Sequence, residues 1–322
     1  MIYIDLSTLP FRPLREAELP TATVLALGNF DGVHMGHRKL LQCVIDKAKA
    51  LSKSAPTTPG VWLFRDAPND FLRSPPTPHI STLNDKLLLF RECGIKIAFL
   101  GDFKHLSGCS PTDFIHTILK KQCRCVHAVC GFNYSFGKRG EGTPEMLREG
   151  FGGNMTEIPP VVFDGDRVSS TRIRNLISEG RIEEAERLLC RPYHFTSAVL
   201  HGKALGRTIS FPTINQDFPH LALIPKKGIY AVRISAPDRS LPTLYGVANV
   251  GTRPTVEKSD HINCETYILD FSGNLYDKKL CVEFIARIRD ERKMDNLDEL
   301  KQAIREDAET ARNIFKEKKL LI

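Results

Sequence analysis

The stretch "LALGNFDGVHMGHRKLL", residues 25–41, joins a short apolar run to an amphipathic one through a glycine-rich loop. The apolar run, residues 23–28, is typical of a buried strand, and the apolar side chains of residues 37–52 recur at helical spacing. The sequence therefore predicts a strand, a loop and a helix in direct succession. Two histidines, His34 and His37, stand where the loop becomes the helix.

The same loop has the properties of an anion-binding site. Its glycines, Gly28, Gly32 and Gly36, permit tight turns and a close approach of a ligand to the backbone. A helix that begins near Gly36 offers unpaired N–H groups and the positive end of its dipole. His34 and His37 add hydrogen-bond donors for phosphate oxygens and for charge that develops on a leaving pyrophosphate. The spacing matches neither a dinucleotide fingerprint nor a Walker loop, and a pair of surface histidines is the plainer alternative.

A second cluster of phosphate-binding residue types lies far along the chain, in "RVSSTRIRNLISEG", residues 167–180. Ser169, Ser170 and Thr171 supply hydroxyls and Arg172 supplies a guanidinium, directly before a helical run. Taken alone, the segment is better explained as a helix N-cap followed by solvated arginines. Together with the histidine loop, it favours a second part of one phosphate site.

The first half of the chain alternates strands with helices. After the first strand we expect further strands at residues 61–64, 95–101, 126–131 and 155–163, and helices at 81–93 and 110–121. Alternation over this length predicts a mainly parallel sheet with helices on both faces, an α/β fold.

The second half consists of short strand-like segments followed by one long helix at 297–319. The segments are "HFTSAVLHG", "GIYAVRIS", "TLYGVANVG", "NCETYILDF" and "KKLCVEFIARI". Such a run predicts a small antiparallel β-barrel with a C-terminal helix. The apolar face expected for that helix comprises Leu297, Leu300, Ile304, Ala308, Ala311 and either Ile314 or Phe315. The halves join near a predicted helix pair at 178–193, so we expect domains at residues 1–185 and 186–322.

Composition sets the broad class of protein. A length of 322 residues is enough for two domains, and 42% hydrophobic with 26% charged residues is typical of a globular protein. The apolar runs are too short for a membrane helix, and the N-terminus does not resemble a signal peptide, so we expect a cytoplasmic protein. The net charge of +7 suits anionic ligands such as nucleotides. Without a basic stripe that carries aromatic residues, a nucleic-acid partner is not expected. The oligomeric state is left open.

Nine cysteines, an odd number, indicate reduced thiols rather than a disulfide framework. The densest cluster is "CRCVHAVC", with Cys123, Cys125, His127 and Cys130. Thiolates and imidazole are zinc ligands, so a zinc site is one interpretation. The residues alternate as in a strand and no second ligand pair follows, which favours buried strand cysteines instead.

Oxygen-bearing side chains in the second half suggest a separate site. In "HGKALGRTISFPTINQ", residues 201–216, Gly202 and Gly206 suit a flap that closes on a nucleotide. Thr213 and Asn215 lie two residues apart, on one face of an extended segment, and their hard oxygens suit Mg²⁺. Taken alone, this short pattern favours a turn in which both side chains bond the backbone.

Glu265 is a carboxylate in the otherwise apolar strand "NCETYILDF". It is a candidate general base for an attacking hydroxyl, although an outward-facing strand carboxylate is also compatible with the alternation. Arg289 in "ARIRDE" is either a ligand-binding residue or a surface partner of Asp290 or Glu291.

These motifs together resemble one family. "GNFDGVHMGHRKLL" is similar to the HxGH nucleotidyltransferase motif as it occurs in bacterial bifunctional riboflavin kinase/FMN adenylyltransferases (FAD synthetases). "GFNYSFG", residues 131–137, resembles that family's third block and "RVSSTRIR" its closing block. The second half matches in "GRTISFPTIN", "GVANVGTRPT", "ETYILDF", "LYDKKLCVEFIARIRDE" and "REDAETAR". The resemblance covers nearly the whole chain in order.

The resemblance implies two reactions. The C-terminal domain would phosphorylate riboflavin with ATP and Mg²⁺, giving FMN and ADP, and the N-terminal domain would transfer AMP from ATP to FMN, giving FAD and pyrophosphate. The implied catalytic residues are Glu265, the base for the terminal ribityl hydroxyl, with His34 and His37. The implied nucleotide- and phosphate-binding residues are Gly28, Phe30, Asp31, Gly32, Gly36, Ser169, Ser170, Thr171, Arg172, Gly202 and Gly206. The implied flavin-binding residues are Asn133 and Arg289, and the implied Mg²⁺ ligands are Thr213 and Asn215.

One segment departs from the family pattern. Where members usually carry FEPHP, this chain has "FRDAP", residues 64–68, with Arg65 at the acidic position and Ala67 at the histidine. Ala67 supports one alternative, a riboflavin kinase whose N-terminal domain no longer transfers AMP. Two others are an HxGH nucleotidyltransferase for another phosphate, such as phosphopantetheine, and a flavin- or RNA-binding regulator. The second-half motifs disfavour a nucleotidyltransferase for another phosphate. The presence of Thr213 and Glu265 disfavours a binding regulator.

Overall fold

The computed structural model describes residues 1–5, 19–201, 211–252 and 261–320. By their contacts these residues form two compact units, one of residues 1–77 and 81–170 and the other of residues 78–80 and 171–322. The boundary predicted at 185/186 lies further along, inside helix α8 (Ile182–Leu189). Each unit is described by itself below.

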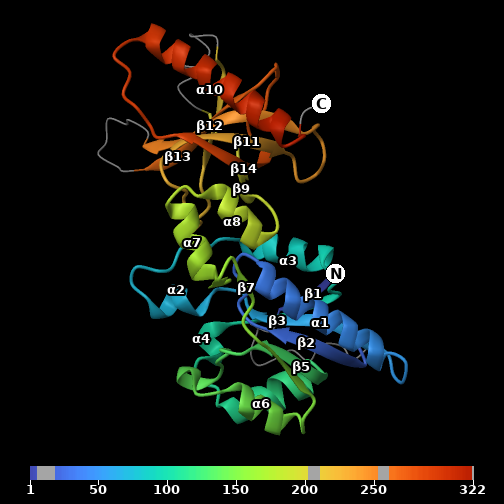
Figure 1. Ribbon diagram of the computed structural model, residues 1–322. Helices are drawn as coiled ribbons and strands as arrows, with labels where there is room; N and C mark the ends of the chain where they lie inside the picture. The colour runs from blue at the N-terminus through green and yellow to red at the C-terminus, as the bar shows by residue number, and fades with distance from the viewer. Residues whose placement is uncertain (6–18, 202–210, 253–260, 321–322) are drawn as a thin grey trace. The chain divides into compact units, whose positions relative to one another are not determined.

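The N-terminal unit is built on a six-stranded parallel sheet in the order β1-β4-β3-β2-β5-β6 (Figure 1). Its strands are β1 (Ile2–Asp5), β2 (Ala22–Leu27), β3 (Thr57–Phe64), β4 (Ile97–Gly101), β5 (Cys125–Gly131) and β6 (Met155–Ile158). All predicted strands are present, and the α/β prediction is confirmed. The prediction of a strand over 155–163 is wrong in extent: β6 ends at Ile158, because Pro159 and Pro160 have no N–H for the ladder. The edge strand β1 was not predicted.

Helices cover both faces of this sheet. They are α1 (Met35–Leu51), α2 (Pro68–Leu72), α3 (Leu83–Glu92), α4 (Phe103–Leu106), α5 (Pro111–Asp113), the π-helix η2 (Phe114–Gln122), the 3₁₀ turn η3 (Lys138–Gly140) and α6 (Pro144–Gly150). The helices α1 and α3 pack on one face through Leu41, Val44 and Phe90. On the other face, η2 and α6 pack through Leu119 and Leu147. The helix predicted at 110–121 is therefore one α-turn followed by a π-helix.

The strand order reverses beside β2. The chain runs outward from β2 to β3 and β4, and then returns to place β5 on the other side of β2. The loops that follow β2 and β5 therefore diverge at the carboxyl edge of the sheet, the place where open α/β sheets bind ligands. A short hairpin of β7 (Val162–Phe163) and β8 (Asp166–Arg167) ends the unit.

The C-terminal unit contains a six-stranded antiparallel sheet in the order β10-β13-β12-β11-β14-β9 (Figure 1). Its strands are β9 (Tyr193–Ala198), β10 (Thr213–Asp217), β11 (Gly228–Ser235), β12 (Leu244–Thr252), β13 (Ile262–Ile268) and β14 (Lys279–Arg289). The sheet curls until its two edges meet, where the N–H of Leu200 donates to the carbonyl of Asn215 at 2.8 Å. The predicted barrel is confirmed, but β10 is a strand rather than the turn that its short polar pattern alone favours.

Helix α10 (Leu297–Glu317) closes the outer face of the barrel. Its Ala311 and Phe315 are buried against Ile229 and Val247 of the sheet. The predicted apolar face is correct at its centre, but Leu297 is 62% exposed because the helix begins beyond the sheet contact. Two further helices, α7 (Ser170–Ser178) and α8, precede the barrel, and α8 packs against β9 and β14. Residues 78–80 belong to this unit because the N–H of His79 donates to the carbonyl of Leu221 at 2.7 Å.

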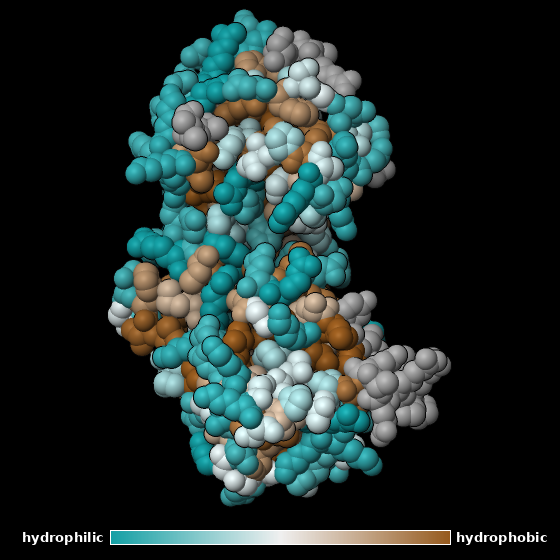
Figure 2. Space-filling view, turned by 90° about the vertical axis from the view of Figure 1, so that its right-hand side faces the viewer, coloured by the Kyte–Doolittle hydropathy of each residue, from teal (hydrophilic) through white to brown (hydrophobic). Residues whose placement is uncertain are grey.

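Figure 2 shows one face of the molecule, on which apolar residues appear as scattered groups among hydrophilic ones. Within the described ranges, no helix is both long enough and apolar enough to cross a membrane.

Candidate active sites

The two histidines of the first loop lie against each other. His34 is buried and is the N-cap of α1, where its Nδ1 accepts a hydrogen bond from the backbone N–H of His37 at 3.4 Å. The two imidazole rings are stacked, with centroids 3.6 Å apart and planes inclined by 16°. A Cβ at Gly36 would lie 3.1 Å from Cε1 of His34, a tight contact that would require the His34 ring to shift by a few tenths of an ångström. Because Nδ1 of His34 is an acceptor, the proton of the neutral ring is on Nε2.

The backbone of the loop has positive φ angles at three positions, a conformation that is uncommon for residues other than glycine. Phe30, Gly32 and Val33 have φ angles of 52°, 82° and 40°. Phe30 is buried and its ring meets that of His37 edge-on, with centroids 5.3 Å apart. Its predicted part in nucleotide binding would therefore be to hold the His37 ring. Positive φ at buried, non-glycine residues concentrates at functional sites, where the surrounding structure enforces it.

Hydrogen bonds join the histidine loop to the serine cluster. The hydroxyl of Ser170 donates to the carbonyl of Asp31 at 2.9 Å, across 139 positions of sequence. On the other side of the turn, the Ser81 hydroxyl accepts from the N–H of Gly32 at 2.9 Å, and the Ser81 N–H donates to the Asp31 carboxylate at 3.2 Å. The two phosphate-binding motifs predicted from the sequence thus meet at Asp31. Ser81, which was not predicted, holds the turn in place.

The remaining predicted residues of the first site are partly accessible. Asn133 is exposed in the loop after β5, and Gly28 and Ser169 are half-buried. Thr171 and Arg172 lie in the first turn of α7, which the contacts assign to the C-terminal unit.

The segment "FRDAP" runs from the end of β3 at Phe64 to the first residue of α2, Pro68. Ala67 is the N-cap residue of α2, and its N–H donates to the Asp70 carboxylate at 3.2 Å. The Arg65 guanidinium lies 3.3 Å from Asp102 and also contacts Asp66.

In the second unit, a row of polar residues crosses three strands. Asn215 of β10 is directly opposite Glu265 of β13, which is directly opposite Asn249 of β12. Directly opposed residues of antiparallel strands have their side chains on the same face. The Asn263 amide donates to Oδ1 of Asn215 at 3.2 Å, and Glu265 is half-buried. The predicted residues Thr213, Asn215 and Glu265 therefore share a face, whereas Gly202 and Gly206 lie outside the described residues.

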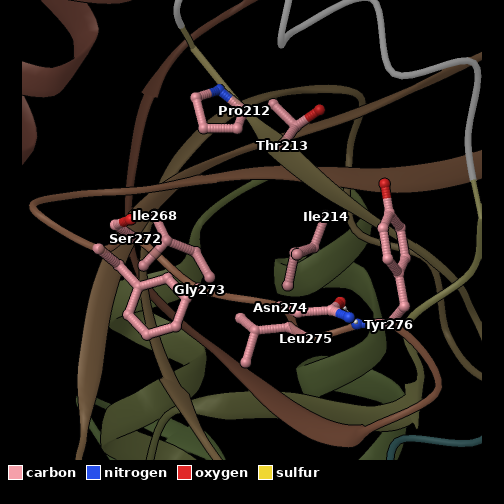
Figure 3. Close-up of a pocket in the computed structure, with 10 residues that line it drawn as sticks. Pro212, Thr213, Ile214, Ile268, Ser272, Gly273, Asn274, Leu275 and Tyr276 are labelled. Atoms are coloured by element: carbon pink, nitrogen blue, oxygen red, sulfur yellow. Dashed lines mark hydrogen bonds between the residues drawn. The ribbon is translucent and has the colours of Figure 1, made fainter.

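A pocket of about 350 Å³ opens beside this row. It is lined by Pro212, Thr213, Ile214, Ile268, Phe271, Ser272, Gly273, Asn274, Leu275 and Tyr276. Figure 3 shows Pro212 and Thr213 at one end of the pocket and Asn274 and Leu275 at the other. Its size and mixed apolar and polar lining are those of a small-molecule site. Thr213 lines the pocket and lies two positions before Asn215 on the same strand, so the pocket and the polar row adjoin.

Arg289 has a partner that neither prediction named. Its Nε and Nη2 atoms donate to the two carboxylate oxygens of Asp307 at 2.8 and 2.6 Å, which ties β14 to α10. Its Nη1 donates to the carbonyl of Asp290 at 3.0 Å. A flavin-binding role for Arg289 therefore rests on the resemblance alone.

The cysteine cluster is buried, as the alternation indicates. Cys125 and Cys130 lie on β5 with His127 between them, and Cys123 precedes the strand. Burial raises the pKa of the Cys125 and Cys130 thiols to about 12. Among the described residues, no group of three or more His, Cys, Asp or Glu side chains is placed to hold a metal ion.

Because His127 is buried, we expect the folding stability of the N-terminal unit to fall in acid. Burial, assisted by Lys47, lowers the pKa of its imidazole from 6.5 to about 4. Below pH 6.5 the unfolded chain takes up a proton that the folded chain does not, so stability present at neutral pH is lost as the pH falls toward 4. The loss approaches about 3 kcal/mol, at 1.36 kcal/mol per pKa unit.

Replacing the ring by a neutral amide tests this. In His127→Gln, the unfolding free energy should fall less between pH 7 and pH 4 than it does in wild type. It is measured by urea unfolding, followed by the fluorescence of Trp62. Trp62 is the single tryptophan of the chain and is buried in the same unit. The exposed His116→Gln should behave as wild type. Equal pH dependence in wild type and His127→Gln would show that another group is responsible.

Fold and sites together define a class of protein: a nucleotidyltransferase-like α/β unit followed by a small antiparallel β-barrel with a C-terminal helix. A family model for riboflavin kinase matches residues 189–315, and one for FAD synthetase matches residues 16–172. The bifunctional riboflavin kinase/FMN adenylyltransferase of Escherichia coli (strain K12) is 34% identical over 298 residues, 91% of this chain and 92% of the relative. That of Bacillus subtilis (strain 168) is 31% identical over 300 residues, with 91% and 92% covered. The chain belongs to the bifunctional riboflavin kinase/FMN adenylyltransferase family.

Among solved structures, one described as a macrolide-efflux protein from Streptococcus pneumoniae is similar over 97% of this chain and 99% of its own. The TM-score is 0.84, with 29% of residues identical.

Proposed function

We propose that this chain phosphorylates riboflavin with ATP to give FMN, and transfers AMP from a second ATP to FMN to give FAD and pyrophosphate. The observation that carries the proposal is that both family models match one chain, in separate ranges, and each range contains a clustered site. We assign adenylyl transfer to the N-terminal unit and phosphoryl transfer to the barrel. Most of the helix pair α7 and α8 lies in residues 173–188, the segment that joins the two matched ranges.

In adenylyl transfer the nucleophile is the phosphate of FMN, which is already ionised, so no strong base is needed. The catalytic task is to stabilise charge on the leaving pyrophosphate. Nε2 of His34 and the N-terminus of α1 are donors for it, and His37, stacked on His34, completes the anion site. Asp31, held by Ser81 and Ser170, fixes the loop from which these groups project.

In phosphoryl transfer the nucleophile is the terminal hydroxyl of riboflavin, which must lose its proton. Glu265 is the base, on a strand face beside the pocket. We place the adenosine of ATP in that pocket, because its apolar and aromatic lining suits a base and Thr213 at its rim leads toward Glu265. Positioning of the two reactants then supplies most of the rate.

The donor set beside Glu265 fits Mg²⁺. The Thr213 hydroxyl and the Asn215 amide oxygen are hard ligands on one strand face, and Mg²⁺ is commonly held by few protein groups together with substrate phosphates. Bound there, Mg²⁺ would neutralise charge on the ATP phosphates. Thr213 and Asn215 would fix where the triphosphate lies relative to Glu265.

Replacing Thr213 by valine keeps the shape of the side chain and removes its oxygen. We expect the apparent Mg²⁺ affinity in FMN formation to fall at least about tenfold, since loss of even an indirect partner typically costs that much. AMP transfer to supplied FMN should hardly change. Thr213→Ser, which restores the oxygen, should recover most of the affinity in Mg²⁺ titrations. An equal loss in both reactions would instead indicate a folding defect.

The nine cysteines are all described and none forms a disulfide, which suits a reducing compartment, and we propose a cytoplasmic location. The proposed ligands are riboflavin, FMN, FAD, ATP and ADP rather than nucleic acid.

Ala67 favours one competing function, a kinase without adenylyl transfer. Against it, the segment with Ala67 leads into an ordered helix, α2, and the histidine loop is intact. ATP labelled at its α- or its γ-phosphate distinguishes the two. The bifunctional proposal requires γ-label to appear in FMN made from riboflavin, and α-label to appear in FAD made from FMN. Absence of α-label from flavin would leave only the kinase.

A further inference from the structure

Asn249 faces the proposed base from the neighbouring strand, and no part of the function described so far uses it. It is directly opposite Glu265 in the β12–β13 ladder, while Asn215 is opposite Glu265 on the other side. Glu265 is therefore flanked by an amide on each neighbouring strand. Because neighbouring strands lie about 4.8 Å apart, two oxygens of one bound polyol chain can reach both Glu265 and Asn249.

The surroundings of Asn249 isolate its amide oxygen. The Oδ1 atom is buried and accepts no hydrogen bond from any residue that the structure describes. Along the same face, Val247 lies two positions earlier and Ile229 is directly opposite, and both belong to the apolar cluster beneath α10. These apolar side chains offer no hydrogen-bond donor. By contrast, the oxygen of Asn215 accepts from the Asn263 amide.

A buried acceptor without a donor is unfavourable and uncommon in folded proteins, so it calls for an explanation. Packing does not supply one, since a leucine would fill the same space without the unfavourable oxygen. A ligand that brings its own hydrogen-bond donor explains why the acceptor is there. Riboflavin carries a chain of hydroxyl groups, and the proposed base acts on the last of them.

We propose that Asn249 is a specificity-determining residue of the kinase site, whose Oδ1 accepts a hydrogen bond from a ribityl hydroxyl next to the one that Glu265 deprotonates. The inference rests on the proposed kinase function. It makes Asn249 the group that distinguishes a flavin with a hydroxylated side chain from one without.

The test compares Asn249→Leu, which removes the acceptor, with Asn249→Asp, which keeps one, in the full chain. Initial rates of FMN formation are measured with riboflavin and ATP varied separately, and with lumiflavin, which lacks the ribityl chain, as competitive inhibitor. For Asn249→Leu we expect KM for riboflavin to rise roughly three- to tenfold, the range for one neutral hydrogen bond. KM for ATP and inhibition by lumiflavin should stay unchanged, and Asn249→Asp should bind riboflavin more tightly than Asn249→Leu.

A thermal scan without ligand separates substrate binding from a structural role. Because Asn249→Leu removes an unsatisfied acceptor, its unfolding midpoint should equal or exceed that of wild type, as should that of the exposed control Asn313→Leu. An unchanged KM for riboflavin would overturn the inference. So would a lowered midpoint with equal rises in both KM values. Wild-type protein that forms no FMN would reject the proposed function itself, which is a separate result.

Discussion

Glu265→Gln should lower the rate of FMN formation by roughly two to four orders of magnitude, the usual range for a positioned general base. Glutamine has nearly the same shape but cannot accept the proton of the ribityl hydroxyl. The carboxylate is half-buried between two amides, Asn215 and Asn249, so the substitution should preserve the local packing. Rates are measured with saturating riboflavin, ATP and Mg²⁺, so that the effect falls on turnover rather than on binding.

Two controls accompany this variant. AMP transfer to supplied FMN should continue in Glu265→Gln, because the histidine site lies in the other unit. Glu309→Gln, on an exposed face of α10, should leave both reactions unchanged. FMN formation near the wild-type rate in Glu265→Gln would show that another group is the base.

Changing His34 and His37 together to alanine should raise the barrier to adenylyl transfer by about 3 kcal/mol or more, since loss of a single donor to developing charge already costs about that. The two rings are stacked and one of them caps α1, so in the proposed site both lie beside an anion bound at the helix N-terminus. The loss should appear in FAD formation from FMN and equally in the reverse reaction, FAD with pyrophosphate. Riboflavin phosphorylation should continue.

His34 has a structural role as well, and a single variant separates the two. His34→Asn retains an N-cap acceptor for α1, a position where asparagine is favourable, but has no Nε2 donor. We expect it to fold normally and still lose adenylyl transfer, while His116→Ala serves as a control at an exposed histidine. A wild-type rate of adenylyl transfer in His34→Asn would show that His34 acts only as the N-cap of α1.

Much of the fold could be predicted because local pattern and tertiary packing agree. The helix expected over 37–52 is observed as Met35–Leu51, since its apolar spacing matches the face that the sheet buries. The strand β1 was missed, and for β10 the sequence left a turn as the alternative to an extended segment, because each is short and lies at a sheet edge. Long-range pairing, rather than local propensity, makes them strands.

The sequence predicted the residues that carry the chemistry of the sites, but not the residues that hold them in position. The histidines, the serine cluster and Glu265 carry recognisable residue types, so the sequence could identify them. Ser81 could not be identified, because its role depends on a hydrogen bond to a turn 49 positions away. Asn249 lies in the quoted motif "GVANVGTRPT", yet only the β12–β13 register places it opposite Glu265. The positive φ of Phe30, which turns its ring toward His37, likewise has no local signal.

The central claim is that one chain makes FAD from riboflavin through two separate sites. The direct measurement is a time course with purified wild-type protein, riboflavin, ATP and Mg²⁺, in which FMN and FAD are resolved and quantified separately. The account predicts that FMN appears first and is then converted to FAD. It also predicts that Glu265→Gln blocks both products from riboflavin, whereas the double histidine variant accumulates FMN without FAD. Wild-type protein that makes FMN but no FAD, even with ample FMN and ATP, would contradict it.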